Sequence, residues 1–273
     1  MQTKLNELKR LLMEAGDLFM ARAVLDWDQS TLMPEGGAAA RARQISLLAR
    51  LEQEKATDPR IGHLLDELQP YAESLPYDHP DAALVRVARR EFERKRKVPP
   101  AFMAEMIQTG AEAYSVWAKA RPENDFKAVR PYLERILDNS RRLADFFPGY
   151  EHIADPLIDI SDHGMKATTL RQLFANLRRE LVPLVQAVTA QPPLDDACLH
   201  RHFPHAGQMA ICEQLVRQIG YDTGRGRLDL THHPFTTRFA AGDVRITTRV
   251  DEHNLADCLF SCLHEAGHAM YEQ

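Results

Sequence analysis

Apolar residues recur at intervals of three and four positions along most of the first 220 positions of the chain. Leu5, Leu8, Leu11 and Leu18 show this spacing, which places apolar side chains on one face of an α-helix. Residues that interrupt helices separate the periodic segments, at Pro34, Gly36, Gly37, Pro80, Pro99, Pro100, Pro122, Pro148, Gly149, Pro192 and Pro193. The pattern predicts roughly eight long helices before Gly220, a residue type that caps helix C-termini.

The period changes near the end of the chain. Val244, Ile246 and Val250 alternate with aspartate, arginine and threonine residues. A two-residue repeat places successive side chains on opposite faces of a β-strand. The segment 243–250 is therefore predicted to be a half-buried strand, and it is the clearest strand signal in the sequence.

A final helix is expected after this strand, from about Asp251 or Asn254 to the end of the chain. Its predicted apolar side consists of Leu255, Leu259, Cys262, Leu263, Ala266 and Met270. No internal repeat or low-complexity linker divides the sequence. We therefore expect one mainly α domain over residues 1–273, with a small β region before the last helix.

The composition is ordinary for a folded protein without a membrane segment. Of 273 residues, 44% are hydrophobic and 27% charged, and no apolar run approaches the ~18 residues of a spanning helix. A net charge of -5 offers no general attraction to nucleic acid, and the first residues do not resemble a signal peptide. We expect a cytoplasmic protein that binds neither nucleic acid nor membrane and keeps its four cysteines reduced and mostly buried.

The last helix carries the sequence His264-Glu265-Ala266-Gly267-His268. Histidines four residues apart project from one face of a helix, one turn apart, and can bind a single divalent ion. Glu265 would not coordinate the ion, but it is placed to accept a proton from a metal-bound water whose pKa the metal lowers. The motif predicts a zinc peptidase with His264 and His268 as ligands and Glu265 as general base.

This motif supplies only two of the three protein ligands that a catalytic zinc ion usually has. Glu272 lies eight residues beyond His264, which is about 12 Å along a helix axis, so one ion cannot reach both. A third histidine six residues after His268 would fall past Gln273, and Tyr271 stands where that pattern needs glycine. A glutamate from a following helix remains, and we expect it to lie outside this sequence.

The sequence resembles the carboxypeptidase Taq family of metallocarboxypeptidases. The resemblance covers the whole chain and rests on the segments WDQSTLMPEGG at 27–37, HPF at 233–235, DVRIT at 243–247 and HEAGHAMYEQ at 264–273. It implies a multi-helix, zincin-like fold, dependence on zinc or cobalt, peptide substrates and a homodimer. It also implies that this chain is the N-terminal portion of a longer enzyme, whose other half supplies the third ligand, so that the chain alone is expected to be inactive.

The resemblance further implies that His233, Asp243, Arg245 and Thr247 line the active site as substrate-binding residues. The planar guanidinium of Arg245 matches the terminal carboxylate of a peptide, but it can equally pair with Asp243 on the same strand face. His233 can bond to a reaction intermediate, or it can merely cap a turn before the next proline. For each residue, both interpretations remain open from the sequence.

Two other functions remain open from the sequence. The chain can be a noncatalytic helical module that acts through dimerisation or partner binding, or a metallopeptidase of other specificity, such as an aminopeptidase. Three further features are interpreted as structural. They are the histidine-rich loop 200–205, the packing of Cys258 and Cys262, and the solvated, partly acidic helix face at 89–97.

Overall fold

The computed structural model describes residues 1–273, which form two compact units. Unit 1 contains residues 1–129 and 199–273, and unit 2 contains residues 130–198. The helix α6 (Phe126–Asp145) begins in the first unit and continues into the second. Each unit is described by itself, because their relative placement is not determined.

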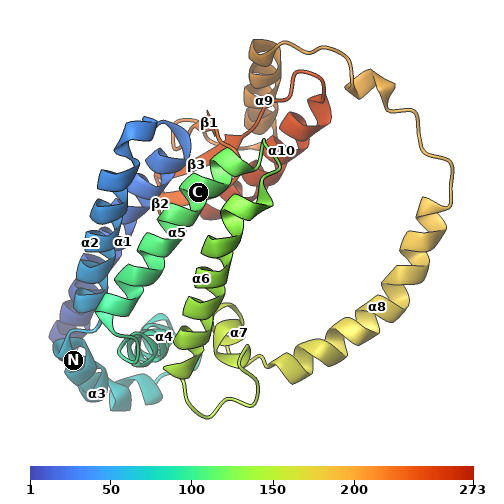
Figure 1. Ribbon diagram of the computed structural model, residues 1–273. Helices are drawn as coiled ribbons and strands as arrows, with labels where there is room; N and C mark the ends of the chain where they lie inside the picture. The colour runs from blue at the N-terminus through green and yellow to red at the C-terminus, as the bar shows by residue number, and fades with distance from the viewer. The chain divides into compact units, whose positions relative to one another are not determined.

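The N-terminal part of unit 1 is built from five long helices. They are α1 (Gln2–Thr31), α2 (Ala38–Ala56), α3 (Pro59–Glu73), α4 (Pro80–Lys95) and α5 (Pro100–Ala120), with the short 3-10 helix η1 (Glu35–Gly37) between the first two. Figure 1 shows α1, α2 and α5 side by side, and α3 packs against α1 and α4. Three of these helices begin with proline, which suits a first turn whose N–H groups have no partner in the helix.

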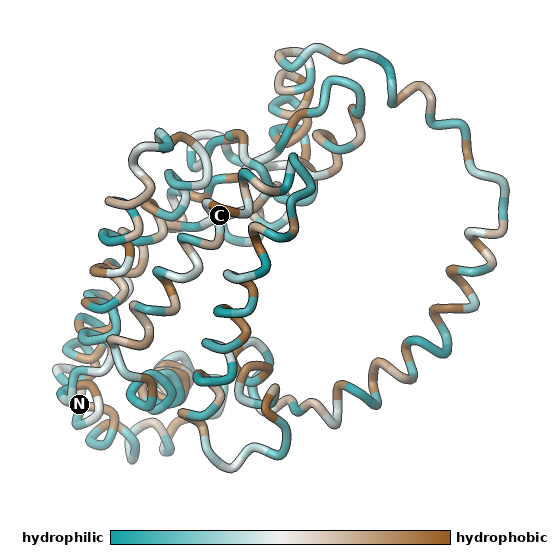
Figure 2. The backbone as a smooth tube through the Cα atoms, viewed as in Figure 1, coloured by the Kyte–Doolittle hydropathy of each residue, from teal (hydrophilic) through white to brown (hydrophobic).

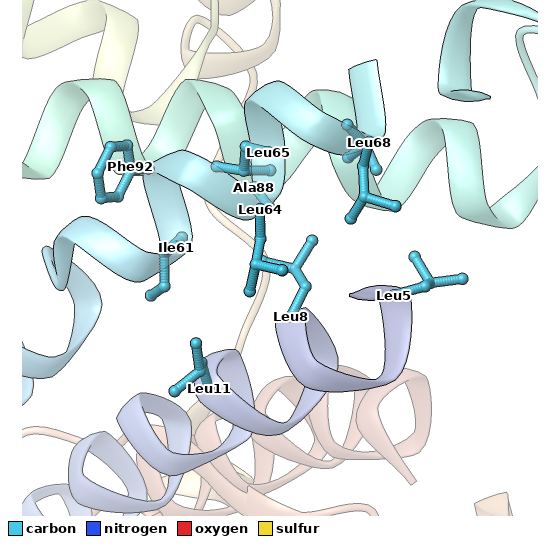
Figure 3. Packing of buried hydrophobic residues seen from close by; sticks show 10 residues of the cluster. Leu5, Leu8, Leu11, Ile61, Leu64, Leu65, Leu68, Ala88 and Phe92 are labelled. Atoms are coloured by element: carbon cyan, nitrogen blue, oxygen red, sulfur yellow. The ribbon is translucent and has the colours of Figure 1, made fainter. Parts of the chain in front are cut away.

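One hydrophobic core joins α1, α3 and α4. Figure 3 shows leucines of α1 pointing toward those of α3, with α4 closing the cluster. Its labelled members are Leu5, Leu8, Leu11, Ile61, Leu64, Leu65, Leu68, Ala88 and Phe92. Each fully buried leucine or phenylalanine contributes about 1.5–3 kcal/mol relative to an exposed one, so this cluster anchors the N-terminal helices.

The C-terminal part of unit 1 holds a three-stranded sheet and two helices. The strands β1 (Leu228–Leu230), β2 (Thr236–Ala240) and β3 (Asp243–Thr248) lie in the order β1-β3-β2, with β1 parallel and β2 antiparallel to β3. The helices are α9 (His205–Ile219) and α10 (Leu255–Glu272), and the short 3-10 helix η2 (Ala197–Leu199) precedes them at the boundary between the units. The sheet therefore has β3 at its centre and β2 at one edge.

The two faces of β3 have different partners. Val244 and Ile246 are fully buried and pack in one cluster with Cys258, Cys262 and Ala266 of α10. Alternate residues of a strand point to opposite faces of the sheet. On the face away from α10, the strand β2 packs against α1. The sheet thus lies between α10 on one face and the end of α1 on the other.

The mainly helical fold with a small β region before the last helix is confirmed. Nine α-helices precede Gly220 where roughly eight were predicted, because α2 and α3 are separate and the sequence gave no Pro/Gly pair between them. Gly220 has a φ of +114° and caps α9 as predicted. The predicted strand ends at Thr248 rather than at residue 250, and β1 and β2 were not predicted.

The predicted apolar side of α10 is wrong in part. The helix buries Cys258, Cys262, Ala266 and Ala269. Leu255, Leu259 and Leu263 are half-buried, and Met270 is exposed. Small side chains let the helix approach the sheet closely, so the buried stripe follows cysteine and alanine rather than leucine.

Unit 2 consists of most of α6, the short α7 (Asp155–Ser161) and the long α8 (Ala167–Thr189). The carboxylate of Asp155 accepts hydrogen bonds from the backbone N–H of Ala167, at 2.8 Å, and of His152, at 3.0 Å. Figure 2 shows apolar and polar residues alternating along α8, whose exposed apolar residues are Leu173, Phe174, Leu177, Leu181, Val182, Leu184, Val185 and Val188. None of the helices is both long and apolar enough for a membrane span.

Candidate metal and catalytic site

The helix α10 presents His264 and His268 to solvent on one side. Their Nε2 atoms lie 3.2 Å apart, and the two rings meet edge to face with centroids 4.8 Å apart. Both residues are exposed, because the buried stripe of the helix faces the sheet instead. The four-residue spacing therefore brings two imidazole nitrogens to one point outside the core, as the sequence predicts.

This nitrogen pair fits a divalent metal ion. Two nitrogens at the usual zinc distance of about 2.0–2.1 Å, in tetrahedral geometry, lie roughly 3.3 Å from each other. The observed separation of 3.2 Å matches that value without movement of the helix. No group of three or more histidine, cysteine, aspartate or glutamate residues in the structure is arranged to hold an ion, so the chain brings together two donors.

Glu265, next to His264 in the helix, is only 7% exposed and contacts β2. Its Oε2 accepts a hydrogen bond from the Oγ1 hydroxyl of Thr236, at 2.7 Å. The same hydroxyl lies 2.8 Å from the backbone carbonyl oxygen of Glu265. The carboxylate is therefore held at the edge of the sheet, one residue from the first predicted ligand.

Glu272 continues this side of α10, two turns beyond Glu265. Its Oε2 accepts an ion-pair hydrogen bond from Nη1 of Arg238 at 2.8 Å. Thr236 and Arg238, two residues apart on β2, thus face the same helix as the strand's alternation requires. Glu272 is paired with arginine rather than with the histidines, in agreement with its rejection as a third ligand.

Asp243 and Arg245 lie on the opposite face of the sheet from α10. Nε and Nη2 of Arg245 donate to the two carboxylate oxygens of Asp243, both at 2.8 Å. The Arg245 guanidinium also stacks 4.4 Å from the ring centroid of Trp27 and 4.9 Å from that of Phe239. Of the two interpretations left open by the sequence, the ion pair is the one present in the structure.

Trp27, near the end of α1, occupies the centre of this face and is buried. A second guanidinium, that of Arg227, lies 5.4 Å from its ring, and it donates two hydrogen bonds to Asp229. Cations above an aromatic face are attracted by its quadrupole. The tryptophan of the WDQSTLMPEGG segment thus packs the end of α1 against two arginine–aspartate pairs of the sheet.

Thr247 and His233 differ in accessibility. Thr247 is fully buried, and its Oγ1 accepts from the N–H of Phe235 at 2.7 Å and donates to the Phe235 carbonyl at 2.9 Å. The two bonds fix the start of β2 and leave the hydroxyl no free proton. The His233 side chain, two residues earlier, is exposed. Of the predicted substrate-binding residues, the structure thus buries Thr247 in a structural contact and leaves the side chain of His233 accessible.

Other clusters of reactive residues in unit 1 have structural partners. Glu252 accepts from the N–H of His205 at the first turn of α9, and that hydrogen bond, with neighbouring histidines, lowers the pKa of its carboxyl. Cys212 and Cys258 face each other with their Sγ atoms 3.4 Å apart. The hydrogen bond with Cys258 lowers the pKa of the Cys212 thiol. The contact with Cys262 and burial outweigh this effect and raise that pKa to about 12. The Cys212 and Cys258 thiols are both buried, and they form no disulfide with each other.

The model of the carboxypeptidase Taq (M32) metallopeptidase family matches residues 7–273 of the chain. Thermostable carboxypeptidase 1 of Thermus thermophilus is 38% identical over 263 residues, covering 92% of this chain and 51% of that protein. Carboxypeptidase 1 of Bacillus subtilis is 35% identical over 254 residues, covering 93% of this chain and 50% of that protein. The chain therefore spans about half the length of the curated relatives it matches.

Solved structures show the same partial coverage. The M32 carboxypeptidase of Deinococcus radiodurans has a TM-score of 0.82 and 46% identity, covering 99% of this chain and 54% of that chain. Metallocarboxypeptidase 1 of Trypanosoma cruzi has a TM-score of 0.81 and 28% identity, covering 100% of this chain and 55% of that chain. The fold matches those structures over almost its whole length.

A helical fold that carries the His-Glu-x-x-His motif on a helix packed against a small sheet is typical of metallopeptidases. The family match and the curated relatives show which metallopeptidase family this is. The chain belongs to the carboxypeptidase Taq family of metallopeptidases.

Sequence reasoning missed one polar contact of the motif, the bond between Thr236 and Glu265. Thr236 follows the His-Pro-Phe segment directly, but β2 has five residues and an irregular pattern of burial. Without β2, nothing in the sequence indicates that residues 29 positions apart meet.

Proposed function

We propose that this chain provides the His-Glu-x-x-His part of a zinc-dependent carboxypeptidase, which removes C-terminal residues from peptides. The observation that carries the proposal is the convergence of the His264 and His268 Nε2 atoms at 3.2 Å beside a buried glutamate. Membership of a family whose relatives are named carboxypeptidases supports the choice of substrate end.

In this proposal His264 and His268 hold the metal, zinc or alternatively cobalt, through Nε2. The bound metal would supply a polarised substrate carbonyl and an acidified water. Glu265 accepts a proton from the attacking water at a carboxylate oxygen and later donates it to the leaving amine. Because two histidines hold zinc weakly, a third donor from residues beyond those of this chain completes the site.

Four residues were expected to bind substrate, and we propose different roles for them. The exposed ring of His233 is available to contact a peptide. Arg245 pairs with Asp243 and stacks on Trp27, and Thr247 bonds to Phe235. We therefore assign these three residues to fixing the sheet rather than to direct carboxylate binding. Homodimerisation and a cytoplasmic location complete the proposal, on the resemblance and the sequence alone.

The proposal is tested by joining this chain to the C-terminal half of the Bacillus subtilis relative and assaying peptides with a free or a blocked C-terminus. We expect zinc-dependent hydrolysis of free C-termini only, and no turnover by the present chain alone. Turnover by this chain alone contradicts the need for a third donor. Cleavage that requires a free N-terminus instead identifies an aminopeptidase.

A noncatalytic binding module is the second candidate, and a specific observation favours it. The apolar stripe of α8, from Leu173 to Val188, is exposed in the structure, and large exposed apolar patches mark interaction sites. This candidate predicts partner binding or self-association that is unchanged when His264 and His268 are both replaced by alanine. Loss of zinc binding together with loss of hydrolysis in that variant favours the peptidase.

A further inference from the structure

The carboxylate of Glu265 occupies a boundary position. Its neighbours Ala266 and Ala269 belong to the buried stripe, whereas His264 and His268 are exposed. A glutamate side chain has several rotatable bonds and loses on the order of 1.5–2 kcal/mol of conformational entropy when fixed. A general base must nevertheless lie within hydrogen-bond reach of the proton that it removes. Something must therefore hold this carboxylate beside the histidine pair.

Thr236 makes that contact from the edge strand. The register pairs Thr236 with Ile246, whose side chain packs against α10, so Thr236 is directed to the same face. Its Oγ1 lies 2.7 Å from Oε2 of Glu265 and 2.8 Å from the Glu265 carbonyl oxygen. One threonine hydroxyl thus meets both the side chain and the backbone of the same residue.

The position of Thr236 is fixed from both sides along β2. Phe235, just before it, is held by the two hydrogen bonds of Thr247. Arg238, two residues after it, is paired with Glu272 of α10. The strand is thus tied to β3 and to the helix on either side of the threonine, which keeps the Thr236 backbone beside Glu265.

We propose that Thr236 is the positioning residue for Glu265, a proposal that rests on the carboxypeptidase function proposed above. A hydroxyl has one proton and can also accept, so it can turn between two partners. Donated to Oε2, the proton holds the ionised carboxylate. Donated to the backbone carbonyl, it leaves Oγ1 able to accept from the carboxyl group after Glu265 has taken a proton from water. Thr236 can hold Glu265 in both forms of its catalytic cycle.

The test compares Thr236→Val, which keeps the shape and removes the hydroxyl, with Thr236→Ser, which restores the hydroxyl. Thr237→Val is the matched control, because Thr237 pairs with Arg245 and faces the other side of the sheet. Crystal structures are expected to show the Glu265 carboxylate displaced in Thr236→Val alone. The His264–His268 spacing and zinc affinity are expected to remain unchanged in all three variants.

In the chain joined to a C-terminal half, Thr236→Val is expected to lower kcat about 10- to 100-fold with little change in KM. Thr236→Ser and Thr237→Val should stay within about threefold of the parent. An unmoved Glu265 in Thr236→Val, or an unchanged kcat, overturns the positioning role. A parent protein that binds no zinc and cleaves no peptide contradicts the proposed function instead. In that case the crystal structures still test whether Thr236 holds the Glu265 carboxylate in place.

Discussion

The guanidinium of Arg245 lies 4.4 Å from the centre of the Trp27 ring, across the face of the sheet that is turned away from α10. The ring joins the first helix of the chain to a strand more than 200 residues later. This contact explains why a tryptophan near the end of α1 and an arginine of the central strand both belong to one structural unit.

Replacing Trp27 by alanine is therefore expected to destabilise unit 1. Loss of a buried tryptophan costs about 3–5 kcal/mol, since a cavity replaces the ring and two guanidinium groups each lose one aromatic contact. Urea unfolding followed by circular dichroism measures the change. Trp117→Ala is the control, because Trp117 is only half-buried and should cost less. Equal losses in the two variants contradict the special role of Trp27.

Two glycines inside helices should respond to alanine in opposite directions. A Cβ at Gly62 would lie 3.0 Å from the buried Phe92 ring, whereas a Cβ at Gly110 would meet nothing within 4 Å. Alanine gains up to about 1 kcal/mol of helix propensity at either place, and overpacking costs about 1–3 kcal/mol at Gly62 only. We expect Gly110→Ala to raise the free energy of unfolding and Gly62→Ala to lower it. A stabilising Gly62→Ala would show that Phe92 moves freely.

The stability of unit 2 is expected to depend on Asp155 at acidic pH. The N–H of Ala167 is the main group that lowers the pKa of this carboxyl, against a smaller opposing effect of burial. A carboxyl with a lowered folded-state pKa stabilises the fold above its unfolded pKa of about 3.9. That stability is lost as pH falls through the folded value.

Hydrogen exchange of the first turn of α8 at pH 6 and pH 3 measures this effect. Asp155→Asn should lower the protection of this turn from hydrogen exchange at pH 6. It should also remove most of the difference in protection between pH 6 and pH 3. Asp162→Asn, at an exposed aspartate of the same unit, should behave as the parent chain does. Equal pH dependence in Asp155→Asn and the parent contradicts the assignment.

The apolar stripe of α8 is expected to cause self-association of the isolated chain. Leu177→Glu combined with Leu184→Glu changes side chains that are already about half exposed, so the free energy of unfolding should change by under about 0.5 kcal/mol per site. Sedimentation velocity should show less association for this double variant. Gln172→Glu adds charge at an exposed polar position of the same helix and serves as the control. Association that is unaffected by the double variant shows that another surface is responsible.

Much of the fold follows from local signals in the sequence. Pro80 and Pro100 begin helices, Gly220 ends one, and the alternation of Val244 and Ile246 marks the central strand. The boundary at Pro59 was also encoded, because Asp58 accepts from the N–H of Arg60 as a helix cap, but a single Asp-Pro step is a weaker signal.

The remaining features depend on contacts between distant segments. Thr236 meets Glu265 only because a five-residue edge strand pairs with β3, and Trp27 meets Arg245 only because α1 crosses the sheet. The histidine pair was predictable because its geometry is set within one helical turn. The buried side of α10 was not, since small residues there pack more closely against the sheet than the leucines do.

Zinc titration combined with peptide hydrolysis tests the central claim most directly. In the chain joined to a C-terminal half, we expect one zinc per chain, lost in His264→Ala and His268→Ala together with activity. Glu265→Gln should keep the zinc and lose at least about 100-fold in kcat, because the ligands remain while the base is removed. Zinc binding that survives replacement of both histidines, or full activity in Glu265→Gln, would contradict the assignment of the metal and catalytic site to α10.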